Sequence, residues 1–271
     1  MSFRKEYYKL FRSLLRKFFT YTKDYRLDYK SEEKLSGKNI LVIGIYLTDH
    51  DNEASLISSY YSQSDFHTVN QFWYAIGNKQ VPESMKDITL GHSQEKIPKF
   101  QLLNKILAKI DYKNYDFIIF TDDDIFVRKN FIDTYTYLVN KYQFKLAQPA
   151  RTRHSYYDHK ICLQAGNRTI ARTTNFVEIG PIFSISKDVF DNFLPFPEDS
   201  PMGYGLDYIW PVISREQKFN MGIIDATPVD HSYREQGKTY SSNNHLEQMQ
   251  MYLNNKEHTL YEDKLVYKIF K

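Results

Sequence analysis

The chain has 271 residues, of which 42% are hydrophobic, so it can bury a sizeable core in one large domain or two small ones. Its net charge of +3 is too small to suggest a nucleic-acid-binding protein, and its single cysteine, Cys162, excludes an internal disulfide and a cysteine-based zinc cluster. The first thirty residues lack a signal-peptide core, and no run approaches the ~20 apolar residues of a membrane span. We therefore expect a globular cytoplasmic protein.

The N-terminal segment carries the basic excess. Residues 1–30 contain nine Lys or Arg and three acidic residues, a charge of +6, which leaves −3 for the rest. Apolar side chains recur there at three- and four-residue spacing, at Phe3, Tyr7, Phe11, Leu14, Leu15 and Phe18. We expect a basic amphipathic helix and a polar linker over residues 1–34. The helix could lie peripherally on an anionic membrane surface or pack on the following domain, and the pattern favours neither.

Strand and helix patterns then alternate. Residues 39–47 (NILVIGIYL) form an apolar run typical of a strand buried on both faces. The segment "SSYYSQSDFHTVNQFWYAIGN" predicts a helix and then a strand around "TVNQFWYAIG". Residues 96–110 predict the clearest helix, with one apolar face made by Phe100, Leu103, Leu107 and Ile110. A strand over residues 115–120 follows, and this order favours an α/β domain with a largely parallel sheet.

Three aspartates, Asp122, Asp123 and Asp124, stand where that last strand ends. Ligands of open α/β sheets bind beyond the carboxyl ends of the strands, and adjacent carboxylates are best tolerated when a cation offsets their charge. The alternative is a solvated turn in which one aspartate caps a helix. The apolar sequence resumes at once with "IFV", which favours a metal site, and oxygen ligands indicate Mg²⁺ or Mn²⁺.

The segment "YDFIIFTDDDIFV" resembles the DxD region of GT-A-fold glycosyltransferases, and its "TDDDIFV" part is similar to the β-1,3-galactosyltransferase and fringe group. The later segments "FKLAQPA", "FVEIGPIFSISKDVF", "GYGLDYIW" and "MGIIDATPVDH" resemble, in order, blocks of a plant and bacterial glycosyltransferase family long catalogued as a domain of unknown function. The resemblance spans residues 96–231, about half of the chain. It implies a GT-A-like (Rossmann-like) domain over residues 35–235, followed by a C-terminal appendage over residues 236–271.

The resemblance also implies roles for the acidic segment and for a distant histidine. Asp124 is expected to bind the cation, Asp122 to contact the donor ribose or the water shell of the metal, and Asp123 to be a neighbour of the donor. His231 is expected to complete the metal site, although a single histidine after a strand is more often structural.

Further donor contacts follow from the same fold analogy. Arg234 and Lys238 could meet the diphosphate if the loop around Gly237 closes over it, although either one taken singly is more often a solvated loop charge, and Lys99 is a similar candidate. The nucleotide base is expected near the end of the first strand, at Tyr46, Thr48 and Asp49.

The segment "PMGYGLDYIWP" contains the expected catalytic base. A carboxylate among large apolar residues is unfavourable unless it has a partner or a task, and Asp207 resembles the base of inverting GT-A enzymes. Many of those enzymes carry "ED" where this chain has "LD", which puts the role of the neighbouring acid in doubt. The alternative is that Asp207 caps a helix. Tyr204 and Trp210 could stack on an acceptor sugar or belong to the core.

Together these features predict a metal-dependent, inverting hexosyltransferase with Mn²⁺ or Mg²⁺ as cofactor. It would move a sugar from a nucleotide-sugar donor to a saccharide or lipid-linked acceptor, as surface polysaccharide or glycolipid synthesis requires. The alternatives are a non-catalytic nucleotide- or carbohydrate-binding module, and a nucleotidyltransferase. The second is disfavoured because no glycine-rich phosphate loop lies near the first strand.

Overall fold

The computed structural model describes residues 14, 37–166, 168–234, 244–256 and 263–271. The helix expected over residues 1–30 lies outside this range except for Leu14.

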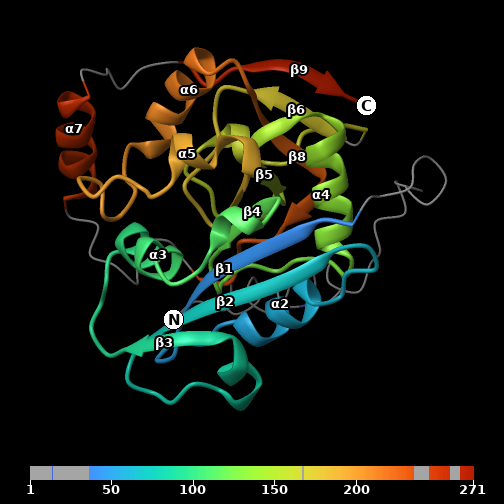
Figure 1. The fold of residues 1–271 in the computed structure, drawn as a ribbon. Helices are drawn as coiled ribbons and strands as arrows, with labels where there is room; N and C mark the ends of the chain where they lie inside the picture. The colour runs from blue at the N-terminus through green and yellow to red at the C-terminus, as the bar shows by residue number, and fades with distance from the viewer. Residues whose placement is uncertain (1–13, 15–36, 167, 235–243, 257–262) are drawn as a thin grey trace, which may run out of the picture.

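One mixed sheet of nine strands organises the described chain, in the order β3-β2-β1-β4-β7-β5-β8-β6-β9 (Figure 1). The strands are β1 (Asn39–Leu47), β2 (Thr68–Ile76), β3 (Thr89–Ser93), β4 (Phe117–Thr121), β5 (Phe144–Arg151), β6 (Ala171–Thr174), β7 (Ile182–Ser186), β8 (Asn220–Val229) and β9 (Val266–Phe270). The first four are paired in parallel, as are β5 and β8, whereas β7 and β6 run antiparallel to their neighbours. The expected α/β fold class is confirmed.

Strand β1 shows why the sheet forms two cores. Its residues are buried on both faces from Ile40 onward, and successive side chains of a strand point to opposite faces. Ile40 and Val42 accordingly join the hydrophobic cluster on one face, while Leu41 and Ile43 join the cluster on the other. Each fully buried aliphatic side chain contributes about 1.5–3 kcal/mol to stability, so a continuous apolar run favours a central position.

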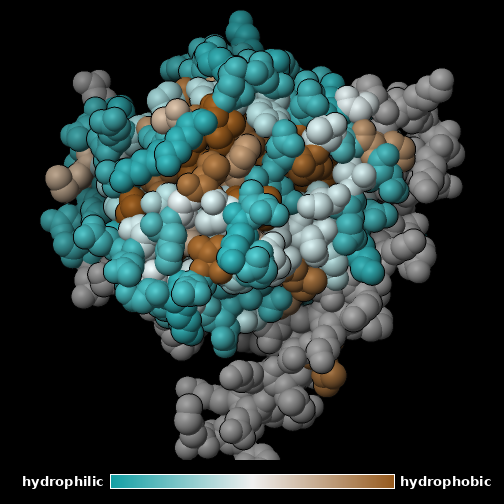
Figure 2. All heavy atoms as spheres, turned by 60° about the horizontal axis from the view of Figure 1, so that its bottom comes forward, coloured by the Kyte–Doolittle hydropathy of each residue, from teal (hydrophilic) through white to brown (hydrophobic). Residues whose placement is uncertain are grey.

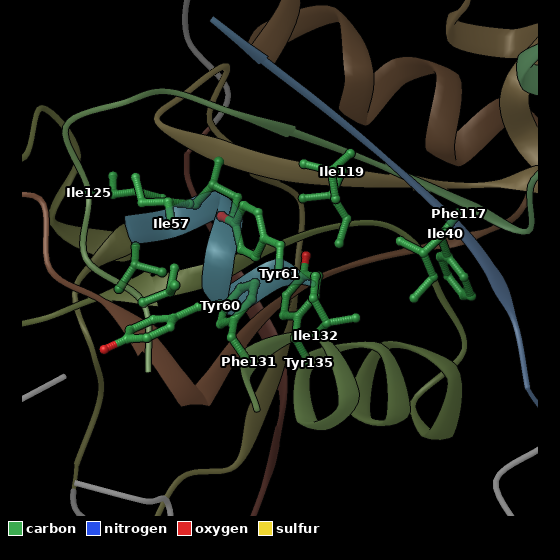
Figure 3. Packing of buried hydrophobic residues seen from close by; sticks show 14 of the residues in the cluster. Ile40, Ile57, Tyr60, Tyr61, Phe117, Ile119, Ile125, Phe131, Ile132 and Tyr135 are labelled. Atoms are coloured by element: carbon green, nitrogen blue, oxygen red, sulfur yellow. The ribbon is translucent and has the colours of Figure 1, made fainter. Parts of the chain in front are cut away.

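Helices cover both faces of the sheet. On one face α2 (Ala54–Tyr61) and α4 (Phe131–Lys141) pack on β1 and β4, and Figure 3 shows Tyr61, Phe131 and Tyr135 gathered between the two helices. The Tyr61 hydroxyl hydrogen-bonds Thr121 at the end of β4, at 3.2 Å. The other face carries α3 (Lys99–Leu107), α5 (Phe190–Phe193), α6 (Leu206–Glu216) and α7 (His245–Asn255). Short 3-10 helices span Glu83–Ile88, Tyr112–Asn114, Lys160–Cys162 and Lys187–Val189.

The described part of the expected C-terminal appendage belongs to this same body. Tyr252 and Leu253 of α7 are buried in the second hydrophobic cluster, and β9 pairs antiparallel with β6 as an edge strand.

Figure 2 shows one face of the molecule, where hydrophilic side chains predominate and hydrophobic ones gather in hollows between them. None of the helices in the described ranges is long and apolar enough to span a membrane.

Candidate functional site

Two strand ends meet at the aspartate segment. Asp122, Asp123 and Asp124 follow β4, and the backbone N–H of Leu47, at the end of the neighbouring β1, donates to Asp123 Oδ2 at 2.8 Å. Just downstream, Phe126 and Asp230 exchange two backbone hydrogen bonds of 2.8 and 3.0 Å. This pairing fixes the chain after the aspartates against the end of β8, and so brings His231 to Asp124.

The three aspartates have different surroundings. Asp122 forms an ion pair with Lys99, 2.7 Å from Nζ to Oδ1. Asp123 is buried against the Arg234 guanidinium, and because burial outweighs that charge, its pKa rises to about 7. Burial also acts on Asp124, but hydrogen bonds and charge from His231 and Arg234 outweigh it there and lower its pKa to about 2. Of the neighbours Asp123 and Asp124, it is therefore Asp124 that stays ionised at neutral pH.

The pair Asp124 and His231 fits part of a cation site. His231 Nε2 lies 3.5 Å from Asp124 Oδ1, close to the ~3 Å that separates adjacent ligands when each bond to the metal is about 2.1 Å. The other oxygen of Asp124 accepts from Arg234 Nε at 3.2 Å. Across the described ranges, no three His, Cys, Asp or Glu residues cluster as a complete metal site. The geometry fits a cation that one or two protein ligands share with substrate phosphates and water, as is usual for Mg²⁺.

A cavity of about 180 Å³ lies beside this pair. Three of its lining residues lie at strand ends: Asp122 follows β4, Arg151 ends β5 and His231 follows β8. The others lie in the loop after β5 (Asp158) and in the loop between β6 and β7 (Glu178, Ile179, Gly180 and Pro181). Asp122 and His231, which were expected at one metal site, both line this cavity, whereas the other charged residues of its wall were not predicted.

Arg151 and Glu178 are the missed residues with the most constrained positions. Their side chains form an ion pair and are 3% and 6% exposed. Arg151 also donates to the carbonyl oxygens of Tyr156 and Gly180, at 2.9 and 2.8 Å. Burial raises the pKa of Glu178, against the lowering effect of Arg151. The sequence did contain a signal for this pair, because the segments "LAQPAR" and "NFVEIG" each carry one charged residue among mostly apolar ones. A charge buried in such a segment needs a partner, so the two residues could have been predicted to pair.

Asp207 lies in the first turn of α6, after Gly205, which has a positive φ of 91°. Gly205 is the N-cap residue and no side chain caps the helix, so the expectation that Asp207 might serve as a cap is wrong. Asp207 is 6% exposed and is not among the cavity-lining residues. Burial raises its pKa to about 7, and the charge of Glu178 adds to this effect.

Two aromatic residues expected at the ligand lie in the core instead. Tyr46 is fully buried and its hydroxyl hydrogen-bonds Thr89 at 2.9 Å. Trp210 is 2% exposed and packs against Phe183 and Phe193. Tyr46 belongs to the hydrophobic cluster on the α2 and α4 face of the sheet, and Trp210 to the cluster on the opposite face, which the sequence pattern alone did not reveal.

The remaining expected contacts are dispersed. Thr48 donates to Ile76 O at 3.3 Å, and the exposed Asp49 accepts hydrogen bonds from the backbone of Asn78 and Lys79, so both stabilise the turns after β1 and β2. Tyr204 is half-buried, with its ring 6.0 Å from that of His245. Lys238 lies outside the described residues.

Comparison with known proteins supports the fold. No family model and no curated protein sequence matches the chain. Among solved structures, that of GalNAc-T7 with UDP, GalNAc and Mn²⁺ matches with a TM-score of 0.51 and 12% identity, over 80% of this chain and 48% of GalNAc-T7. The structure of S. aureus TarS 1-349 in complex with UDP-GlcNAc matches with a TM-score of 0.51 and 12% identity, over 83% of this chain and 68% of TarS 1-349.

This chain thus spans about half the length of GalNAc-T7. Both neighbours are glycosyltransferases of the GT-A fold, and at such low identity the likeness shows a shared Rossmann-like fold.

Proposed function

We propose that the chain is a metal-dependent, inverting glycosyltransferase that moves a hexose from a uridine diphosphate sugar to a saccharide or lipid-linked acceptor. The observation that carries this proposal is the meeting of Asp124 and His231, from two distant strand ends, beside a cavity of about 180 Å³. It is supported by the shared fold with structures that contain UDP, UDP-GlcNAc or Mn²⁺. Surface polysaccharide or glycolipid synthesis would use such a reaction.

In this proposal the strand-end residues hold the donor. Asp124 and His231 would hold Mn²⁺ or Mg²⁺, which would neutralise charge on the diphosphate leaving group. Arg234 adds a guanidinium suited to phosphate oxygens, and Lys238 a second cation. Asp122, oriented by Lys99, accepts hydrogen bonds from the donor.

Asp207 is the proposed general base. An inverting transfer requires a base opposite the leaving diphosphate, so the base must come from a segment other than the aspartate strand end. Asp207 would take the proton of the acceptor hydroxyl as that oxygen attacks the anomeric carbon. A pKa of about 7 suits a group that must gain a proton near neutral pH.

Ligand-dependent thermal stability tests the metal and donor assignment. A ligand that binds only the folded state stabilises it by mass action, so UDP with Mn²⁺ should raise the melting temperature of the parent. Asp124→Ala should abolish the Mn²⁺-dependent part of this increase, and His231→Ala should reduce it less completely. Asp191→Ala, which removes an exposed carboxylate paired with Lys113, is the matched control. An unchanged Mn²⁺-dependent affinity for UDP in Asp124→Ala would contradict the metal assignment.

Turnover assays separate the enzyme from its alternatives. Release of UDP from a UDP-sugar, stimulated by an acceptor, would support a transferase. Tight donor binding with no hydrolysis or transfer would support a binding module, and pyrophosphate release from a nucleoside triphosphate would support a nucleotidyltransferase.

A further inference from the structure

A second cavity, of about 370 Å³, lies among α6, β6, β8 and β9, which are neighbours in Figure 1. It is at the opposite end of β8 from the proposed metal site, because Asn220, which begins the strand, lines it, whereas His231 follows the end of the strand. Strand β8 has ten residues, each rising about 3.3 Å, so the two sites are roughly 30 Å apart. The volume falls in the range of about 300–1,000 Å³ that is typical of small-molecule sites.

The charged residues in the described wall of this cavity are both cationic. They are Arg215 and Lys218, and no Asp or Glu belongs to the described lining. Arg215 already interacts with another part of the protein, so the argument concerns Lys218. The exposed Lys218 side chain makes no hydrogen bond or ion pair within the described structure. Because an ammonium group can only donate hydrogen bonds, its best partner in a ligand is an anionic oxygen.

The backbone of Lys218 is unusual for a lysine. Helix α6 ends at Glu216, Gln217 is its C-cap, and Lys218 follows with a φ of 56°, a conformation that favours glycine. Gln143 holds the same position after α4, with a φ of 54°, but its side chain donates to Asn140 O at 2.7 Å and so stabilises the helix end. Lys218 makes no such bond in the described structure. A side chain kept at a strained position without a structural contact indicates a function.

Three further side chains of the wall are available to a ligand. Thr173, Asn220 and Tyr267 line the cavity and form no side-chain hydrogen bond within the described ranges, and Tyr267 is 60% exposed. The Ser214 hydroxyl, by contrast, is used by the protein, since it donates to Phe219 O at 2.6 Å. Hydroxyl and amide groups both donate and accept, which suits the hydroxyl groups of a saccharide, and an aromatic ring adds an apolar surface with a polar end.

We propose that this cavity is a second binding site, which takes a saccharide that carries an anionic group, a carboxylate or a phosphate. Lys218 would contact the anionic group, while Asn220, Thr173 and Tyr267 would contact the hydroxyl groups and the ring. A ligand held there is too far from Asp124 to react at the proposed metal site, so the cavity binds the saccharide and does not convert it. This inference does not depend on the proposed transferase function.

Titrations of the full chain, followed by the amide chemical shifts of Lys218 and Asn220, test the proposal. The acidic probes are glucuronate, galacturonate, glucose 6-phosphate and galactose 6-phosphate, and the reference probes are glucose, galactose and inorganic phosphate. At least one acidic sugar should bind about fivefold or more tightly than both its neutral counterpart and inorganic phosphate. Whether that sugar carries a carboxylate or a phosphate identifies the anionic group.

Lys218→Gly separates binding from folding. The variant should weaken binding of that sugar by about tenfold or more, whereas its urea midpoint should be no lower than that of the parent, because glycine adopts this backbone conformation without strain. Gln143→Gly is the matched control, since it makes the same change after α4 and should leave the sugar affinity unchanged.

Three results would overturn the inference: no acidic probe shifts these amides, neutral sugars or inorganic phosphate bind as tightly, or Lys218→Gly binds like the parent. The affinity for UDP should be the same in Lys218→Gly and the parent. A parent that fails to bind UDP would contradict the proposed function and leave this inference standing.

Discussion

The Arg234 side chain pairs with the aspartate carboxylates at the proposed metal site. Its guanidinium contacts Asp123 and lies 3.2 Å from Asp124, so without a donor it acts as the counter-ion of the aspartate segment. In the proposed function, a bound diphosphate would offer the same guanidinium a better anionic partner, which would leave Asp124 available to the cation. Metal and nucleotide binding should therefore depend on each other through this one residue.

Replacing Arg234 by Gln should change the two affinities in opposite directions. Mn²⁺ alone should bind about tenfold more tightly, because Asp124 loses a competing cation, whereas UDP in the presence of Mn²⁺ should bind about tenfold more weakly. Electron paramagnetic resonance of free Mn²⁺ and calorimetry with UDP measure the two effects. Arg215→Gln, on the exposed side of α6, is the control. A loss of both affinities would show that Arg234 does not compete with the metal.

Asp207→Asn should lower turnover by roughly 10²- to 10⁴-fold, the usual range for removal of a general base, with little change in donor affinity. The parent rate should rise as the pH increases through about 7, because only the ionised carboxylate accepts a proton. The variant should lose this dependence. Near-parental turnover, or a product that retains the anomeric configuration of the donor, would contradict the assignment of Asp207 as base of an inverting enzyme.

The same residue links pH to stability. The folded-state pKa of Asp207 is about 7, above its ordinary value of 3.8, so the folded protein binds this proton more tightly than the unfolded chain. The contribution of Asp207 to the free energy of unfolding should therefore fall as the pH rises from about 4 to about 7. The free energy of unfolding of Asp207→Asn should equal that of the parent at pH 4 and exceed it at pH 8 by up to about 4 kcal/mol. Urea unfolding at the two pH values measures the difference.

At the scale of elements, the start of α6 depends on glycine. Gly203 has a positive φ of 85°, and a Cβ at this position would overlap the Phe100 ring of α3. Gly203→Ala should therefore lower the free energy of unfolding by more than about 1 kcal/mol. Gly166→Ala, where no atom lies within 4 Å of the added Cβ, should stay within about 0.5 kcal/mol of the parent. If the two variants were equally stable in urea, the Phe100 ring would be able to move away from the added methyl group without cost, which would contradict this prediction.

The sequence was informative where hydrophobic periodicity decides the structure. The expected strands over residues 39–47 and 115–120 correspond to β1 and β4, and the helix expected over residues 96–110 corresponds to the shorter α3, which begins after Pro98. The antiparallel direction of β7 was not predicted, because an apolar run looks the same in either direction. The direction of β7 is set by its pairing with β4 and β5, which are distant from it in the sequence.

The same distinction applies to the candidate site. Asp124 and His231 were expected at one metal site because the segments that contain them resemble, in order, those of GT-A glycosyltransferases, and the two side chains lie 3.5 Å apart. The pair between Arg151 and Glu178 was missed, since their contact depends on how β5 and the loop before β7 are placed in space. For Trp210 both an acceptor contact and a core position were open, because one sequence cannot show which face of α6 is covered.

At the scale of the whole molecule, the described sheet begins at Asn39, after the basic segment. Deleting residues 1–30 should leave a soluble, cooperatively unfolding domain if this segment is a peripheral membrane device, because its apolar stripe would then not belong to the core. In that case the parent, but not the truncated protein, should sediment with vesicles that contain anionic lipids. Aggregation or loss of cooperative unfolding after truncation would show instead that the segment packs on the domain.

The strand order also determines when the site can exist during synthesis. The parallel half of the sheet, β3-β2-β1-β4, is made entirely from residues 39–121, whereas β6 lies between β8 and β9, two strands that are both synthesised after it. Non-local pairing of this kind slows folding and delays completion of the sheet. Asp124 leaves the ribosome about one hundred residues before His231, its partner beyond β8. Metal-dependent nucleotide binding would therefore arise late in synthesis, only after the parallel half of the sheet has joined the half that contains β8.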